Sequence, residues 1–208
     1  IVLRSFMREA GTHAIAVGFP AGIHYAFDAE NVRLAIAWKG RFLDARGTWF
    51  ERFTPPAEPL GDSSIVFPTG VPFVMDHDVE SPWPNRSAES MGYHFSGYRL
   101  DAAGIPTLLY RVGKTRIEDR IEALSRRTLR RSWTIDSGDS ASPLVWCVHE
   151  ASNLRLKDGQ AAVGDGLTVR VISPAEIAGH VQESSAKKRW LIPLPSKESQ
   201  KVEVEYSW

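Results

Sequence analysis

Three consecutive side chains in this sequence, Asp76, His77 and Asp78, could ligate a metal ion. In an extended strand the two carboxylates would share one face while the histidine pointed to the other, which is poor geometry for holding one ion. In a loop they could bind calcium, but the string lacks the glycine-punctuated spacing of a known calcium loop. The pattern therefore favours a solvated polar turn, and we expect no metal site.

The residues that usually perform catalysis form no recognisable motif. The six histidines are scattered without an HxH or HxxxH pair, and no nucleophile elbow, P-loop or dinucleotide fingerprint is present. The adjacent carboxylates Glu118 and Asp119 would lie on opposite faces of a strand, which does not suit acid–base work on one bond. We therefore assign no catalytic residue and favour a protein that is not an enzyme. The alternative is a sugar-active enzyme of the mutarotase or epimerase kind, with a cleft lined by His24, His94 and a carboxylate.

Two tryptophans in a proline-rich stretch suggest a specific binding surface. Trp49 and Trp83 lie in a region that also holds basic, acidic and amide side chains: Arg46, Arg52, Asp76, Asn85 and Arg86. Flat rings stack on the C–H faces of sugars, while neighbouring carboxylates, amides and guanidinium groups bind the hydroxyls. We therefore name Trp49, Trp83, Arg52, Asp76 and Asn85 as candidate carbohydrate-binding residues. The competing interpretation is that both tryptophans anchor long loops by burying a large apolar area.

Two basic clusters, RRTLRR at 126–131 and KKR at 187–189, could contact an anionic polymer. In a strand such residues divide between both faces, and nearby acidic side chains can pair with them. The simpler interpretation is a charged face in contact with solvent, and polyanion contact is the alternative.

The composition limits the function further. Lys and Arg number 25 and Asp and Glu also number 25, so no cationic surplus favours nucleic acid as a partner. The apolar runs are too short to cross a bilayer, so we expect no membrane insertion. The single cysteine, Cys147, excludes an internal disulfide and a CxxCH haem-attachment motif, and we expect no cofactor.

Alternation of apolar and polar residues with a period of two dominates the chain and predicts an all-β fold. Strands are expected at 13–19, 23–27, 32–38, 41–44, 64–67, 71–75, 93–100, 105–112, 115–122, 127–135, 144–149, 153–156, 160–163, 167–172, 189–192 and 202–208. Tight turns are expected between them, one of them at Lys39-Gly40, and a helical turn only at Ala175–Val181. Such spacing favours one domain over 1–208, an antiparallel β-sandwich of either the ordinary kind or the large supersandwich kind of mutarotase-like domains. A proline- and aromatic-rich loop region would interrupt it at about 46–86.

Several strings resemble the β-rich C-terminal region of large planctomycete-type c-type cytochromes, which are often labelled membrane-bound dehydrogenases. They are AGTHAIAVGFP at 10–20, YAFDAE at 25–30, WKGRFLDA at 38–45, GYRLD and GIPT at 97–107, and VEYSW at 204–208. The resemblance covers most of the chain and thins at about 55–85 and 137–188. The family's haem-attachment motif is missing, so electron transfer is not carried over to these residues.

The resemblance implies a piece of a longer, exported redox protein, located in the periplasm or outside the cell. Together with the aromatic residues, it predicts a non-catalytic accessory module that contacts carbohydrate or a neighbouring domain. A purely structural domain would show neither a pocket nor an aromatic surface.

Overall fold

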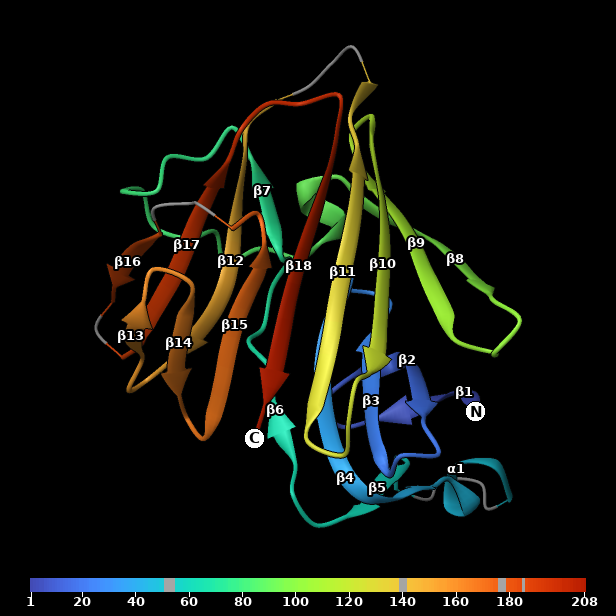
Figure 1. The fold of residues 1–208 in the computed structure, drawn as a ribbon. Helices are drawn as coiled ribbons and strands as arrows, with labels where there is room; N and C mark the ends of the chain where they lie inside the picture. Colours follow the sequence, from blue (N-terminus) through green and yellow to red (C-terminus); the bar gives the residue numbers. More distant parts are fainter. Residues whose placement is uncertain (51–54, 139–141, 176–178, 185) are drawn as a thin grey trace.

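Alternating inward and outward side chains build three antiparallel sheets in the computed structural model, which describes residues 1–50, 55–138, 142–175, 179–184 and 186–208 (Figure 1). The first sheet has six strands, with β6 beside β4: β1 (Val2–Met7), β2 (Gly11–Gly18), β3 (Ile23–Asp28), β4 (Arg33–Asp44), β5 (Glu58–Gly61) and β6 (Ile65–Val66). The second has eight, in the spatial order β13 (Arg155–Asp158), β14 (Ala161–Gly164), β15 (Leu167–Ser173), β18 (Ser199–Ser207), β11 (Thr128–Asp136), β10 (Thr115–Ala123), β9 (Pro106–Val112) and β8 (Tyr93–Leu100). The third has four, in the order β16 (His180–Glu183), β17 (Lys188–Leu194), β12 (Leu144–Ala151) and β7 (Phe73–Met75).

The C-terminal strand β18 joins the two halves of the eight-stranded sheet. It pairs with β11 along one edge and with β15 along the other. Its residues Val202, Val204 and Tyr206 are buried, while the residues between them face outward. This strand therefore places the hairpins of 93–136 beside those of 155–173 (Figure 1).

Both smaller sheets pack on the inward face of the eight-stranded sheet. The Phe73 ring of β7 meets the Trp133 ring of β11 edge-on, with 5.4 Å between ring centroids. Phe27 of β3 stacks at 6.4 Å on Tyr110 of β9. One apolar core cluster draws residues from all three sheets. The predicted all-β antiparallel sandwich is confirmed.

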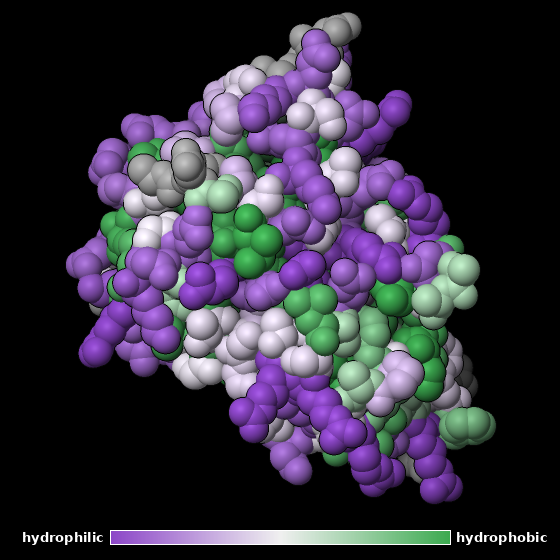
Figure 2. Space-filling view, in the orientation of Figure 1, coloured by the Kyte–Doolittle hydropathy of each residue, from purple (hydrophilic) through white to green (hydrophobic). Residues whose placement is uncertain are grey.

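The four tryptophans in predicted strands are buried in the core, as their alternation indicates. They are Trp38, Trp133, Trp146 and Trp190. On the eight-stranded sheet, the face that points away from the core carries exposed and partly exposed residues at alternate positions of β10 and β11. Figure 2 shows polar side chains over much of this outward face.

The predicted turn at Lys39-Gly40 is wrong, because β4 runs through it. Gly40 has a φ of 99°, and the pairing register with β5 shifts between Gly40 and Leu43. The Trp38 indole N–H donates to the carbonyl of Phe42 at 2.6 Å. A glycine in the left-handed region therefore bends the strand here without reversing it.

The positions of the helices also differ from the prediction. Helix α1 (Arg46–Phe50) and a 3-10 turn, η1 (Glu89–Met91), lie in and beside the proline-rich region. Of the helical turn predicted at Ala175–Val181, residues 176–178 lie outside the described residues, and His180 and Val181 belong to β16. Pairing with β17 outweighs the local helical signal there. Within the described ranges, no helix has the length and apolar character needed to span a bilayer.

Candidate functional site

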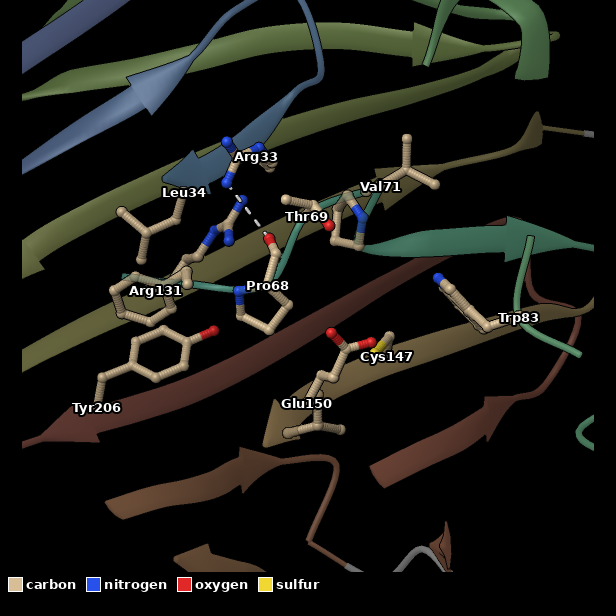
Figure 3. A pocket seen from close by; sticks show the side chains of 14 residues that line it. Arg33, Leu34, Pro68, Thr69, Val71, Trp83, Arg131, Cys147, Glu150 and Tyr206 are labelled. Carbon is tan, nitrogen blue, oxygen red and sulfur yellow. Dashed lines mark hydrogen bonds between the residues drawn. The ribbon is translucent and has the colours of Figure 1, made fainter. Parts of the chain in front are cut away.

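A cleft of about 570 Å³, which we call the outer cleft, opens where the ends of β12 and β17 meet two loops. The loops are the segment at 69–70 before β7 and the segment at 83–87 before η1. Residues 31 and 33, where β4 begins, and residues 184 and 186, between β16 and β17, also line it. A smaller cavity of about 40 Å³, the inner cavity, shares Arg33, Thr69, Gly70, Trp83 and Glu150 with the cleft (Figure 3).

The outer cleft is cationic. Its lining includes four basic side chains, Arg33, Arg86, Lys187 and Arg189, against one carboxylate, Glu150. Such an excess of positive charge favours an anionic ligand.

Arg33 is fixed by a network that begins at Asp28. The Asp28 carboxylate accepts hydrogen bonds from Arg33 Nε at 3.2 Å and from Asn31 Nδ2 at 2.9 Å. The Arg33 guanidinium also donates to the carbonyls of Glu9 and Pro68, at 2.6 and 3.4 Å. Arg33 is therefore held in place in the lining of the cleft, and the Asp28 carboxylate neutralises its charge.

Lys187 and Arg189 share the carboxylate of Glu150. Glu150 lies directly across the strand pair from Arg189, because β12 and β17 are antiparallel in this register. Its oxygens lie 2.8 Å from Lys187 Nζ and 2.5 Å from Arg189 Nε, the second contact being an ion pair without hydrogen-bond alignment. The Glu150 side chain is 6% exposed.

Trp83 both anchors its loop and borders the cleft. It is 9% exposed, and its ring meets the His77 ring edge-on at a centroid distance of 5.3 Å. Its backbone N–H donates to Gln182 Oε1 at 3.3 Å, and the Gln182 amide donates to the carbonyls of Val79 and Ser81. This burial supports the anchoring interpretation and leaves only a small part of the ring for a ligand.

The inner cavity reaches a buried ion pair. Arg131 of β11 donates to Asp119 of β10 from Nε at 2.9 Å and from Nη2 at 2.6 Å, and Tyr110 donates to the same carboxylate at 3.1 Å. Burial lowers the pKa of Arg131, but the charge and hydrogen bonds of Asp119 together outweigh burial and raise this pKa above its ordinary value. Burial also raises the pKa of Tyr206 to about 12. Arg131 is therefore charged and Tyr206 neutral near neutral pH.

Cys147 also lines the inner cavity. Burial raises its pKa to about 12, and the charge of Glu150 adds to the effect. The thiol is therefore protonated at neutral pH and is a poor nucleophile.

The structure separates the residues that the sequence put forward for carbohydrate binding. Trp83 and Asn85 line the outer cleft. Trp49 is 60% exposed on α1 and Asp76 follows β7, and neither belongs to the lining. Arg52 lies outside the described residues. Binding by these five residues stays a prediction.

The Asp76-His77-Asp78 string follows β7 as irregular backbone and leads into a turn closed by the Ser81 N–H donating to the Asp78 carbonyl at 2.9 Å. The Asp78 carboxylate accepts a hydrogen bond from the Glu80 N–H at 3.1 Å, and His77 packs on Trp83. Within the described part of the chain, no three His, Cys, Asp or Glu side chains come close enough together to hold a metal ion.

The histidines of the alternative enzyme hypothesis are not brought into the cleft. His24 accepts a hydrogen bond from the Phe19 N–H through Nδ1 at 3.2 Å, and its Nε2 lies 2.9 Å from the carbonyl of Gly40. Burial lowers the pKa of His24, although the Gly40 contact opposes the shift. His94 lies on β8, at the edge of another sheet. His24 therefore connects two backbone segments and has no ring nitrogen left for proton transfer.

Sequence reasoning missed Arg33 and Glu150 and interpreted 187–189 as a solvated face. Lys188 pairs with Glu183, but Lys187, directly before β17, and Arg189 within it line the cleft. The period of two at 187–189 was the available signal, because it divides three consecutive cations between two faces.

No family model matches this chain, and no curated protein matches it. Among solved structures, similar chains include a heparinase III, at 7% identity and a TM-score of 0.46, and the heparan sulfate lyase HepC from Pedobacter heparinus, at 12% identity and 0.46. The alignments cover 98% and 99% of this chain but 35% and 36% of those two chains. The chain thus spans about a third of the length of the solved chains that it matches. Neither description names a cytochrome, so a redox parent protein stays a prediction.

Proposed function

We propose that this chain is a carbohydrate-binding module of a larger protein and that the outer cleft binds an acidic saccharide. The observation that supports this most directly is the convergence of four cationic side chains on one cleft of about 570 Å³. That volume lies within the range of small-molecule sites, roughly 300–1,000 Å³.

The cationic groups suit carboxylate or sulfate substituents. Arg86 is exposed, and its Nη2 donates to the carbonyl of Ser90 at 2.7 Å. The Lys187 side chain is 51% exposed. Guanidinium and ammonium groups in such positions form charge-assisted hydrogen bonds with anionic oxygens.

The neutral groups of the cleft suit the rest of a sugar. Asn31 and Asn85 supply amides, Ser87 and Ser184 supply hydroxyls, and Trp83 supplies an apolar edge. Amides and hydroxyls both donate and accept hydrogen bonds, as sugar hydroxyls require. Since Trp83 is mostly buried, it would contribute contact along its edge rather than a full stacking surface.

The test is direct binding of labelled oligosaccharides measured by fluorescence anisotropy. The probes are an oligogalacturonate, a heparan sulfate oligosaccharide and a neutral cello-oligosaccharide. We expect at least one acidic probe to bind, more tightly than the neutral one and more weakly as salt is added. The double variant R86A/K187A should bind about tenfold more weakly or worse, because two charge-assisted contacts are lost.

The matched control is R99A/K201A, which removes two cations from the outward face of the eight-stranded sheet. Its affinity should stay within about twofold of the parent protein, since such distant, screened charges contribute little. Equal losses in both variants would indicate non-specific attraction, and failure of every acidic probe to bind would refute the proposal.

Export of the parent protein to the periplasm or the cell exterior, and redox domains elsewhere in it, complete the proposal. The sequence resemblance supports both. Mass spectrometry of the native full-length protein, searching for covalently bound haem, would test the redox part.

A further inference from the structure

Glu150 is the one carboxylate that the described residues place in the lining of the outer cleft. Its side chain is 6% exposed and belongs to the inner cavity as well. Figure 3 shows the Glu150 carboxylate pointing into the pocket, between Pro68 and Cys147. The carboxylate therefore belongs to the wall that a ligand in the outer cleft would approach.

Glu150 also neutralises part of the cleft's own positive charge. Its two oxygens lie within 2.8 Å of Lys187 and Arg189, so both cations already have an anionic partner. Arg33 is paired with Asp28 in the same way. Among the described residues, only Arg86 of the four cations has no carboxylate within ion-pair distance.

An anionic ligand group that approaches Lys187 and Arg189 must therefore compete with Glu150. The competition has two parts, repulsion between the two anions and loss of the ion pairs that Glu150 makes. An anionic group that binds at Arg86 breaks no ion pair of this kind, because no carboxylate of the described residues lies within ion-pair distance of Arg86.

We infer that Glu150 is a specificity-determining residue of the outer cleft, an internal anion that occupies Lys187 and Arg189 and limits the affinity for acidic saccharides. This inference rests on the proposed function of the cleft. It implies that a saccharide is held first through an anionic group at Arg86, and that affinity depends on how far the ligand displaces Glu150.

The experiment compares the parent protein with Glu150→Gln in the anisotropy assay, using the oligogalacturonate and the heparan sulfate oligosaccharide. Glutamine keeps the size of the side chain and removes its charge. We expect E150Q to bind an acidic probe about three- to tenfold more tightly, with steeper salt dependence, because one repelling charge is gone and two cations are released. The matched control is E118Q, which removes a paired carboxylate from the outward face of the eight-stranded sheet. The control should change affinity less than twofold.

The outcomes separate this inference from the proposed function. If the parent protein binds and E150Q binds equally or more weakly, the inference is wrong and the proposed function stands. If only E150Q binds, Glu150 excludes acidic saccharides from the native cleft, so the proposed function fails and Glu150 acts as a barrier to acidic saccharides instead of tuning their affinity. If neither binds while both remain folded by circular dichroism, both are wrong. The double variant E150Q/R86A should lose the tighter binding of E150Q, because the anionic group of the saccharide is held first by Arg86.

Discussion

The buried pair Asp119–Arg131 should be among the most sensitive positions in the fold. Asp119 is fully buried and Arg131 is 4% exposed. Asp119→Asn keeps the shape of the side chain but leaves the Arg131 charge without a counter-ion between the sheets. Breaking a buried pair by removing one partner costs about 3–5 kcal/mol. For a chain of this size each kcal/mol shifts Tm by roughly 2–4 °C, so Tm should fall by about 6–20 °C.

The assay is thermal and urea unfolding followed by circular dichroism, with E118Q as the neighbouring control. Glu118 is 41% exposed and pairs with Arg99, so its loss should cost under about 1 kcal/mol. The triple variant Y110F/D119L/R131M should recover most of the stability, because apolar residues replace the buried pair and the Tyr110 hydroxyl that donates to it at little net cost. A D119N cost under about 1 kcal/mol would contradict the claim that Arg131 depends on a buried counter-ion.

Three further predictions follow from burial. Trp83→Ala should lower the free energy of unfolding by about 3–5 kcal/mol in urea denaturation, because Trp83 is buried. Trp49→Ala, at an exposed position, should change it by under about 1 kcal/mol, and similar losses in the two variants would contradict the burial of Trp83. Burial lowers the pKa of His24 and His149, so below a pH of about 6.5 the unfolded chain binds protons that the folded chain does not. The urea midpoint should therefore fall as the pH is lowered from about 7 to about 5, and a constant or rising midpoint would refute this. Cys147, which is partly buried and has a raised pKa, should react with Ellman's reagent slowly in the native protein and quickly in denaturant, and rapid native labelling would contradict the raised pKa.

The strands could be predicted because their signal is local. The alternation in Tyr93–Leu100 follows from one more buried and one more exposed face. The continuous apolar run Leu144–Val148 follows from a strand that is covered on both faces. The course of the chain at Gly40 could not be predicted correctly, because a glycine with a positive φ permits both a reversal of the chain and a bulge within a strand. The register of β4 against β5 decides between the two, and that register depends on distant residues.

The cleft could be predicted only in part. Trp83 and Asn85 are close in sequence and lie in a loop rich in aromatic residues, which is the kind of segment that often lines sites. Arg33, Glu150 and Arg189 come from three distant segments. Their approach depends on the pairing of β12 with β17 and on the packing of the first and third sheets on the second, and one sequence does not reveal either.

Hydrogen–deuterium exchange with and without an acidic oligosaccharide tests the central claim most directly, because it locates the binding surface without a substitution. The claim predicts slower exchange at 83–87 and 186–189 when the saccharide is present, with little change at α1 and on the strands β8 to β11. Protection confined to α1 or to the outward face of the eight-stranded sheet would contradict it, and so would uniform exchange at saturating saccharide.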